Sequence, residues 1–274
     1  LELNINRSTI SRHIKDLESR LGVILCRRGR GGFALTPEGE SVYRAAITMM
    51  GAIDDFQQEV NDIHGRLTGP LSIALFDKTV TNEACKIHQA FAAFDKEAPE
   101  VHPEIHVEPI NAIETGVMEG RFQLGVIPNH RPSSSLAYYK LFEEQMYLYC
   151  AAPHPLFSRP AAGLSAEKIQ ACKYVGIGYH SPNMEVGRTM GQQRNATAFD
   201  QEAVAHLVLS GAYLGYLPEH YARGLVEAGR MRALLPQAFQ YVCEFSVIVR
   251  RSPQPNRVAQ KLLEALISAH KPQS

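Results

Sequence analysis

The first apolar residues of the chain recur at helical spacing. The stripe consists of Ile10, Ile14, Leu17 and Leu21. Steps of four, three and four residues place these side chains on one face of an α-helix. The opposite face then carries Ser8, Arg12, Lys15 and Ser19. Asn6 before the stripe and Gly22 after it are typical helix caps. The pattern predicts an amphipathic helix over residues 6–21 with a polar, cationic outer face.

A segment with a basic centre follows that helix. The sequence VILCRRGRGGFALT has two apolar runs around a glycine-rich centre, which predicts a β-hairpin. Its centre carries Arg27, Arg28 and Arg30. Glycine lets a backbone approach a phosphate closely, and arginine pairs with phosphate oxygens in a forked geometry. A helix followed by a basic hairpin is the pattern of a winged helix-turn-helix, in which the helix enters the major groove and the wing contacts the DNA backbone.

A long helix with a regular apolar seam is predicted next. Thr36 suits the N-cap, Pro37 suits the first helical position, and Thr68-Gly69-Pro70 ends the pattern. The seam consists of Val42, Ala46, Met49, Ile53, Phe56, Val60, Ile63 and Leu67. Its steps alternate between four and three residues, as in a coiled coil. Packing on the body of the same chain is the alternative, but acidic residues outside the seam favour pairing between two chains.

Beyond Pro70 the pattern changes to that of an α/β protein. Apolar runs predict strands over residues 71–76, 105–110, 122–127, 146–152, 174–178, 196–199 and 241–250. Helices are predicted over residues 79–98, 200–209 and 257–270, with a short helix ending at Glu119. The β-α-β-α-β order at the start of this region indicates a parallel sheet covered by helices.

Charge is distributed unevenly, although the whole chain is neutral. It has 28 basic and 28 acidic residues, yet residues 1–35 carry seven basic residues against three acidic ones. Residues 36–66 reverse this balance, with two basic residues against six acidic ones. The local excess of positive charge favours an anionic partner such as DNA, and a dimer would double the number of basic contacts.

Length and composition narrow the class of protein further. With 274 residues, of which 45% are apolar, the chain can form one large domain or a few smaller ones. We find no apolar run long enough for a membrane span and no secretory leader. The five cysteines are scattered, as in reduced cytoplasmic proteins. We expect a cytoplasmic protein without a membrane partner, and the start at Leu1 suggests that upstream residues are missing.

Residues 6–39 resemble the DNA-binding segment of LysR-type transcriptional regulators. The Ser-Arg-x-Ile-Lys-x-Leu-Glu run of that family is present as Ser11, Arg12, Ile14, Lys15, Leu17 and Glu18. Its Leu-Gly pair and its Leu-Thr-x-x-Gly run are present as Leu21, Gly22, Leu35, Thr36 and Gly39. Cys26 stands where the family usually has phenylalanine. The family places a full helix and most of a second before this stretch, so residues 1–36 would form a partial winged helix-turn-helix domain.

The resemblance implies double-stranded DNA as a partner. The residues that would read bases are Arg7, Ser8, Thr9, Ser11 and Arg12. The residues that would hold phosphates are Lys15, Arg27, Arg28 and Arg30. In the family the linker helix, here residues 37–69, forms a homodimer, and a homotetramer is the family expectation. A rigid paired helix can hold two recognition helices about 34 Å apart, one turn of DNA.

The resemblance continues more loosely over residues 70–274, through GPLSIALF, EGRFQLGVIP, CAAPHPLF and LVLSGAYLGYLP. It implies an effector-binding domain folded like a periplasmic solute-binding protein, with one lobe at about 70–139 and 244–274 and another at about 140–243. Ligands bind such sheets beyond the carboxyl ends of the strands. This rule nominates Asp77, Lys78, Thr79, Asn111, Pro128, Asn129, Gly178, Tyr179, His180, Ser181, Phe199 and Asp200. Helix N-termini there could hold a carboxylate, with Lys78 and His180 adding charge.

Two other functions explain parts of the chain. A solute-binding protein accounts for residues 70–274 but not for the first 69, and a small-molecule enzyme could use the same α/β body. The pairs Cys85/His88 and His102/His106 do not complete a metal tetrad. We find no nucleophile elbow, P-loop or dinucleotide fingerprint. The sequence therefore predicts no enzyme, metal or cofactor, but a transcriptional regulator that binds DNA and a small effector.

Overall fold

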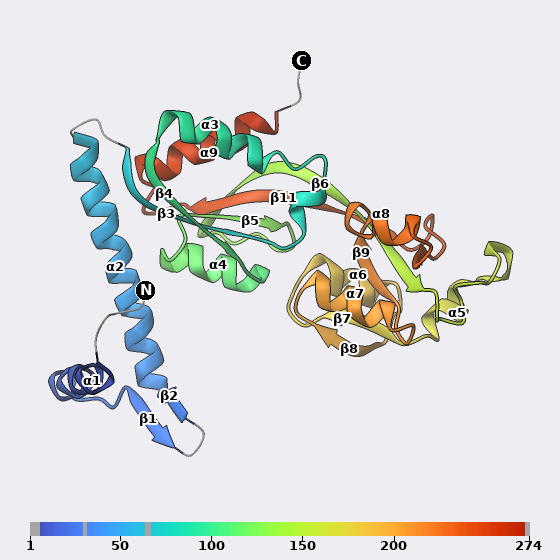
Figure 1. The fold of residues 1–274 in the computed structure, drawn as a ribbon, viewed down its shortest axis with the longest axis horizontal. Helices are drawn as coiled ribbons and strands as arrows, with labels where there is room; N and C mark the ends of the chain where they lie inside the picture. Colours follow the sequence, from blue (N-terminus) through green and yellow to red (C-terminus); the bar gives the residue numbers. More distant parts are fainter. Residues whose placement is uncertain (1–5, 30–31, 64–66, 272–274) are drawn as a thin grey trace. The chain divides into compact units, whose positions relative to one another are not determined.

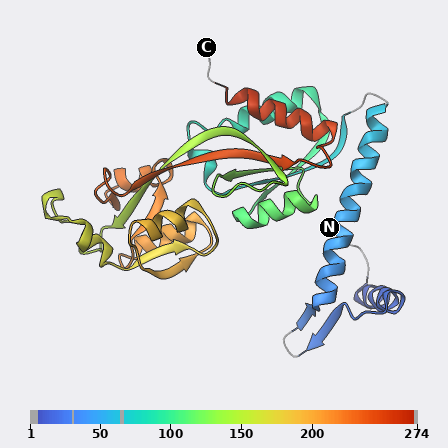
Figure 2. The same cartoon turned by 180° about the vertical axis from the view of Figure 1, so that it is seen from behind.

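The computed structural model describes residues 6–29, 32–63 and 67–271. The chain divides into two compact units, Leu1–Asp54 and Asp55–Ser274. The first unit contains a helix, a hairpin and the start of a long helix, and the second contains a large mixed sheet, a small parallel sheet and their helices (Figure 1). Figure 2 shows the same ribbon from behind.

In the first unit, α1 (Arg7–Leu21) is capped at both ends as the sequence predicts. Asn6 accepts a hydrogen bond from the backbone N–H of Ser8 at 3.1 Å, and Gly22 ends the helix with a left-handed φ of 69°. The hairpin pairs β1 (Cys26–Gly29) with β2 (Gly32–Leu35) in antiparallel register. α2 (Pro37–Ile63) follows directly. The predicted helix, hairpin and long helix are thus confirmed.

Glu18 and Gly39 fix the hairpin between α1 and α2. The Oε1 of Glu18 accepts the backbone N–H groups of Leu25 and Cys26 at 2.7 and 3.1 Å. The hydroxyl of Thr36 accepts the N–H of Gly39 at 2.9 Å and so caps α2. A Cβ on Gly39 would lie 2.0 Å from the carbonyl oxygen of Leu25. Only glycine permits this approach, so Gly39 sets how closely the hairpin and α2 pack.

The apolar seam of α2 is exposed over most of its described length. Met49, Ile53, Phe56 and Val60 are exposed, Val42 and Ala46 are half-buried, and the side chain of Ile63 lies outside the described residues. Leu67 lies beyond the described end of α2 and packs against the core of the second unit. In the single chain Leu67 therefore contributes to the core of the second unit, and its place in the dimer seam stays a prediction. Thr68, Gly69 and Pro70 begin a strand instead of only ending a helix.

The first lobe of the second unit is built on parallel strands. They are β3 (Thr68–Leu75), β4 (Glu100–Val107) and β5 (Leu124–Pro128). β3 lies between the other two, with Ile73 opposite both Ile105 and Leu124. α3 (Ile87–Glu97) and α9 (Arg257–Ala269) lie side by side on one face of the sheet, and α4 (Ile110–Glu119) covers the other (Figures 1 and 2). The β-α-β-α-β order confirms the predicted parallel sheet.

Two long antiparallel strands run through both lobes. β6 (Leu136–Ala151) pairs with β11 (Gln240–Arg250) from Leu136 opposite Arg250 to Tyr147 opposite Gln240. β5 pairs with β11 in the first lobe, and β9 and β10 pair with β6 in the second. The seven-stranded sheet therefore has the order β10-β6-β11-β5-β3-β4, with β9 also on β6. The lobe boundaries expected between residues 139 and 140 and between 243 and 244 lie within this strand pair.

The second lobe adds a small parallel sheet and a set of helices. β7 (Tyr174–Ile177) pairs with β8 (Arg194–Ala198), while β9 (Gly215–Pro218) and β10 (Met231–Ala233) extend the large sheet. The helices are α5 (Ala166–Gln170), α6 (Pro182–Thr189), α7 (Gln201–Leu209) and α8 (Glu219–Glu227), with a short 3-10 turn, η2 (Ala161–Gly163). α7 packs on β6, β7 and β9, so its N-terminus is held against both sheets.

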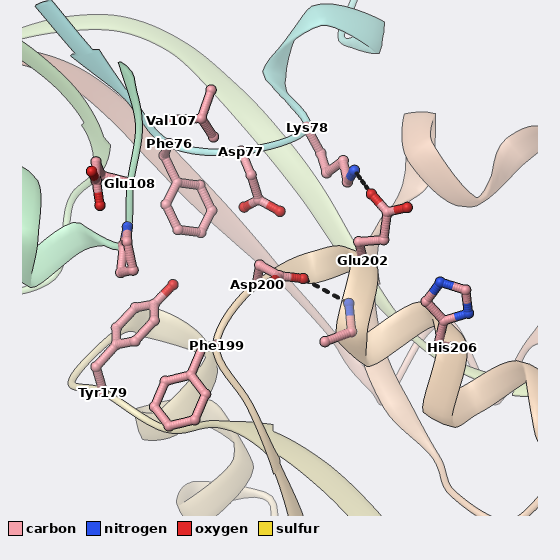
Figure 3. Close-up of a pocket in the computed structure, with 12 residues that line it drawn as sticks. Phe76, Asp77, Lys78, Val107, Glu108, Tyr179, Phe199, Asp200, Glu202 and His206 are labelled. Carbon is pink, nitrogen blue, oxygen red and sulfur yellow. Dashed lines mark hydrogen bonds and ion pairs between the residues drawn. The ribbon is translucent and has the colours of Figure 1, made fainter. Parts of the chain in front are cut away.

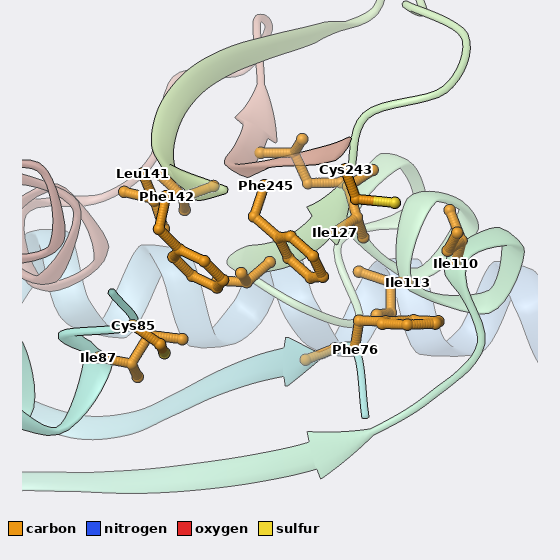
Figure 4. Close-up of a cluster of buried hydrophobic side chains, with 14 of the residues drawn as sticks. Phe76, Cys85, Ile87, Ile110, Ile113, Ile127, Leu141, Phe142, Cys243 and Phe245 are labelled. Atoms are coloured by element: carbon orange, nitrogen blue, oxygen red, sulfur yellow. The ribbon is translucent and has the colours of Figure 1, made fainter. Parts of the chain in front are cut away.

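Aromatic side chains fill the core beside the crossing strands (Figure 4). The rings of Phe142 and Phe245 stack 4.8 Å apart, and the ring of Phe76 lies 6.2 Å from that of Phe245. Burying a phenylalanine side chain contributes roughly 1.5–3 kcal/mol to the free energy of folding. Phe76 directly follows β3 and precedes Asp77. The core therefore fixes the backbone from which Asp77 projects.

One predicted helix is much shorter in the structure. In place of a helix over residues 79–98, the chain forms a 3-10 turn, η1 (Thr79–Thr81), and α3 begins only at Ile87. Asn82 interrupts the helix: its Oδ1 accepts the N–H of Ala84 at 2.9 Å, and its Nδ2 donates to the carbonyl oxygen of Glu143 at 3.0 Å. Side chains that bond to nearby backbone compete with helix formation.

Several predicted strands have different ends. β4 runs over Glu100–Val107 instead of 105–110, and β6 begins at Leu136 instead of 146. Most residues of β4 are exposed at the edge of the sheet, and Tyr139, Lys140 and Glu143 are exposed in the first half of β6. Neither strand start therefore has the continuous apolar run that marks a buried strand.

We expect Gly39→Ala to destabilise the first unit by about 2 kcal/mol, because the new methyl group would overlap the carbonyl oxygen of Leu25. Gly224→Ala is the matched control, since a Cβ at Gly224 meets nothing within 4 Å. Urea unfolding followed by far-UV circular dichroism measures both. Equal stability of the two variants would show that the close approach at Gly39 is not required.

Candidate functional site

The first unit presents basic side chains on α1 and β1. Arg12, Lys15 and Arg27 are exposed, as is Ser8. Thr9 and Ser11 are half-buried. Arg30 lies outside the described residues, as do the side chains of Arg7 and Arg28. The described part of the predicted DNA-binding set therefore includes an exposed cationic surface on helix and hairpin.

A cavity of about 550 Å³ lies between the end of β3 and the start of α7 (Figure 3). We call it the outer cavity. The first lobe contributes Phe76, Asp77, Lys78, Val107, Glu108 and Pro109. The second lobe contributes Tyr179, Phe199, Asp200, Glu202, Ala203 and His206. The structure thus brings together five of the residues nominated from the sequence, namely Asp77, Lys78, Tyr179, Phe199 and Asp200.

A smaller chamber of about 20 Å³ shares Phe76 and Tyr179 with the outer cavity. We call it the inner chamber, and the two together the inter-lobe cleft. Two further nominated residues, Pro128 and Ser181, line it. Its other polar lining residues are Glu144, Asn183, Gln201 and Tyr241. The chamber is therefore a small space beside the outer cavity, lined by polar and apolar side chains together.

Asp77 and Lys78 reach from the first lobe to α7 of the second. The Oδ2 of Asp77 accepts the backbone N–H of Gln201 at 2.9 Å, which caps the first residue of α7 from the opposite lobe. Lys78 forms an ion pair with Glu202. The backbone of Lys78 is left-handed, with a φ of 59°. A non-glycine residue in this conformation is strained, so the surrounding contacts hold it in place.

A second set of polar contacts joins the lobes beside the cleft. The Oγ1 of Thr81 lies 2.8 Å from the Nδ1 of His220, whose Nε2 lies 3.0 Å from the Oε2 of Glu144. Arg223 donates to Glu83 at 2.8 Å. Burial raises the pKa of the Glu144 carboxyl above its ordinary value, while the hydrogen bond with His220 opposes that shift. The chain of contacts thus links the first lobe to a carboxyl group in the inner chamber.

Asp77 is the titratable group most affected in the outer cavity. Burial raises the pKa of its carboxyl from 3.8 to about 6. The N–H of Gln201 and the charge of Lys78 lower it, while the charges of Asp200 and Glu144 raise it further. The charged form of Asp77 is therefore held in the cleft at a cost in free energy.

Five nominated residues line neither compartment: Thr79, Asn111, Asn129, Gly178 and His180. Asn111 is exposed on α4, because the strand before it ends earlier than predicted. Asn129 donates to Glu244 at 2.8 Å, and the Nε2 of His180 lies 3.0 Å from Glu185. A position after a strand therefore does not by itself place a side chain in the cleft.

Sequence reasoning missed residues of two kinds. Gln201, Glu202 and His206 lie on α7, where the Asp200 N-cap already marked the first turn facing the cleft. Glu144 and Tyr241 lie within the crossing strands, where no loop or glycine signal distinguishes them. The first group could have been found from the helix start, whereas the second required the strand pairing.

Neither a metal-binding cluster nor a membrane-spanning helix was found in the described residues. No group of three or more His, Cys, Asp or Glu side chains in residues 6–29, 32–63 and 67–271 is arranged to hold a metal ion. In the same ranges, no helix has the length and apolar character needed to cross a membrane.

The raised pKa of Asp77 predicts that ionisation of this carboxyl lowers the free energy of unfolding as the pH rises. Asp77→Asn would remove this pH dependence. A raised folded-state pKa gives stability below pH 3.8 that is lost as the pH rises through about 6. We expect the free energy of unfolding of the native chain, relative to the variant, to fall by about 3 kcal/mol across that window. Urea unfolding at several pH values measures it. Asp95→Asn, at an exposed site on α3, is the control, and an equal pH dependence in both variants would contradict the assignment.

Two protein families match this chain. Residues 1–40 match the bacterial regulatory helix-turn-helix protein of the lysR family, and residues 64–271 match the LysR substrate binding domain. The second match alone covers most of the chain.

Individual relatives agree with these matches. The HTH-type transcriptional activator BauR of Pseudomonas aeruginosa is 40% identical over 264 residues, which cover 96% of this chain and 87% of BauR. The crystal structure of full-length CbnR complexed with its target DNA aligns with a TM-score of 0.63 at 17% identity, covering 97% of this chain and 91% of CbnR. Full-length LysG from Corynebacterium glutamicum, with its effector Arg bound, aligns with a TM-score of 0.53 at 18% identity. The alignment covers 98% of this chain and 90% of LysG. This chain belongs to the LysR family of transcriptional regulators.

Proposed function

We propose that this protein binds operator DNA through its first unit and a small effector through the inter-lobe cleft, and that the effector changes the DNA contacts. The observation that carries the proposal is the make-up of the cleft. Its lining comes from both lobes, and polar bonds cross it from Asp77 to Gln201 and from Lys78 to Glu202. An occupant of such a cleft contacts both lobes, so it can change how they are held together.

The exposed cationic surface on α1 and β1 supports the DNA-binding part. α1 would enter the major groove, with Arg12 close to base edges, while Arg27 on the hairpin would contact phosphates. BauR is a transcriptional activator and CbnR was solved with its target DNA, which agrees with such a role. We place the protein in the cytoplasm, where a bacterial regulator meets DNA.

The exposed seam of α2 supports pairing of two copies. Large apolar side chains at a coiled-coil spacing lie in contact with water in a single chain, and a second α2 would bury them. Two paired chains present two DNA-reading units, as an operator with two half-sites requires. A homodimer is therefore the smallest functional assembly that we propose.

The size and position of the inter-lobe cleft support a small effector. Its outer cavity of about 550 Å³ lies within the range of small-molecule sites, roughly 300–1,000 Å³. LysG, which has the same fold, was solved with Arg as its effector. A ligand shifts a conformational equilibrium only by its difference in affinity for the two states. The bonds of Asp77 and Lys78 to α7 provide that difference, because an occupant competes with or reinforces them.

Loss of a base contact and loss of a phosphate contact should affect DNA binding differently. We expect Arg12→Ala to reduce the preference for operator over random DNA by about 1–3 kcal/mol, because a base contact is lost. Arg27→Ala should weaken binding to operator and random DNA about equally. It should also reduce the slope of log affinity against log salt concentration by about one. Fluorescence anisotropy measures this, with DNA from beside the chain's own coding region and random DNA at two salt concentrations.

Arg230→Ala is the control for this experiment, since Arg230 is exposed in the second unit. Native protein that shows no preference for the adjacent DNA would contradict the proposed function. The reverse pattern for Arg12 and Arg27 would overturn the division between base and phosphate contacts.

The seam of α2 gives a separate prediction about assembly. We expect Phe56→Glu to convert the dimer to monomer at micromolar concentration, because it places a charge in the apolar interface. Gln57→Glu adds the same charge at an exposed neighbouring position outside the seam and should leave the dimer intact. Sedimentation equilibrium distinguishes the two. A Phe56→Glu variant that remains dimeric would exclude this seam as the interface.

A further inference from the structure

Two buried acceptor oxygens in the inter-lobe cleft have no donor in the described part of the chain. They are the Oδ1 of Asp77 and the Oε1 of Gln201. The two residues are neighbours, since the other Asp77 oxygen accepts the backbone N–H of Gln201 at 2.9 Å. Gln201 is only 4% exposed and lines the inner chamber. A buried acceptor without a donor is destabilising, so both oxygens favour an occupant that carries N–H or O–H groups.

The charge of the outer cavity favours a cation. Its lining contains four carboxylates, from Asp77, Glu108, Asp200 and Glu202, against one lysine and one histidine. Lys78 is already engaged by Glu202, as the ion pair in Figure 3 shows. The expectation that Lys78 would attract an anionic group therefore lacks a free positive charge in this structure. An anion would instead meet the carboxylates of Asp77 and Asp200.

The apolar walls of the cavity suit the carbon skeleton of such a cation. The rings of Phe76, Tyr179 and Phe199 lie on one side of the Asp77 carboxylate (Figure 3). Phe199 is 60% exposed, so its ring is accessible to a ligand. Aromatic faces attract ammonium groups and also pack against methylene groups. Acceptors at one end and aromatic walls beside them form a site for an alkyl or aryl amine.

We propose that the effector of this protein carries a protonated amine, whose N–H groups donate to Asp77 Oδ1 and Gln201 Oε1 while its carbon skeleton packs on the three aromatic rings. The inference rests on the proposed function, because it assigns a chemical class to the effector of the same cleft. It also explains why a carboxylate is held there in a buried position: the ammonium group adds a positive charge beside Lys78, which is already paired with Glu202.

The titration of Asp77 agrees with this geometry. Burial raises the pKa of its carboxyl to about 6, with Asp200 and Glu144 raising it and Lys78 lowering it. A bound cation favours the ionised form, so amine binding should weaken as the pH falls below about 6. Binding of an anion would show the opposite trend.

Thermal unfolding of the full chain with matched four-carbon probes at millimolar concentration tests the proposal. The probes are butylamine, putrescine, γ-aminobutyrate, butyrate, succinate and butanol. We expect at least one amine-bearing probe to raise the Tm with rising concentration, and butyrate, succinate and butanol to leave it unchanged. A Tm increase with butyrate or succinate, or none with any amine, would overturn the proposal.

Asp77→Asn locates the binding. The asparagine oxygen can still accept the N–H of Gln201, while its NH₂ group replaces the unpartnered oxygen with a donor. We expect the affinity for the stabilising amine to fall about tenfold or more, because a charge-assisted hydrogen bond is lost. Asp95→Asn removes the same charge outside the cleft and should change nothing. Equal affinity in the native chain and both variants would contradict binding at Asp77.

DNA binding of the same protein separates this inference from the proposed function. Selective binding to the DNA beside its own coding region, together with failure of the amine probes, would reject the amine but retain the regulator. Amine binding that depends on Asp77, without any DNA preference, would retain the inference about the cleft and reject its role in regulation.

Discussion

The antiparallel pairing of β6 with β11 is the constraint on which the second unit depends. Because both strands continue through the two lobes, the lobes share one sheet and one backbone hinge. Movement between them is then limited to bending and twisting of this pair. The same strands place Glu144, Tyr241 and Cys243 in the inner chamber, so the hinge also forms part of the cleft. The two strands that connect the lobes therefore also line the space next to the outer cavity.

This arrangement leaves polar groups buried at the cleft. Asp77 and Glu144 both have raised pKa values, mainly because the lobes cover them. Asp77 caps α7 across the cleft, and Glu144 meets His220, which in turn meets Thr81 of the first lobe. The contacts of Asp77 with Gln201 and of Thr81 with His220 are made only while the lobes are together. Stability and ligand response are thus coupled, because the groups that hold the lobes together are the groups that an effector would contact.

The sequence predicts the fold better than the cleft. Regular spacing determines α1 and α2, and the caps at Asn6, Gly22 and Thr36 fix their ends locally. The helix expected from Thr79 fails because Asn82 bonds to the backbone, a choice that apolar spacing does not reveal. In the cleft, Asp77 after a strand and Asp200 at a helix cap were found from the sequence, whereas Glu144 needed the strand register. The pairing of Lys78 with Glu202 joins residues far apart in the chain, so the sign of the site's charge follows only from the fold.

If the protein is a ligand-responsive regulator, effector binding in the cleft and DNA binding by the first unit are thermodynamically coupled. The ratio of the Kd for random DNA to that for DNA beside the coding region should be measured with and without an amine that raises the Tm. The account predicts that this ratio changes, and that bound DNA changes the amine affinity by the same factor, as linkage requires. A ratio that stays the same at saturating amine, in protein that binds both ligands, would contradict it.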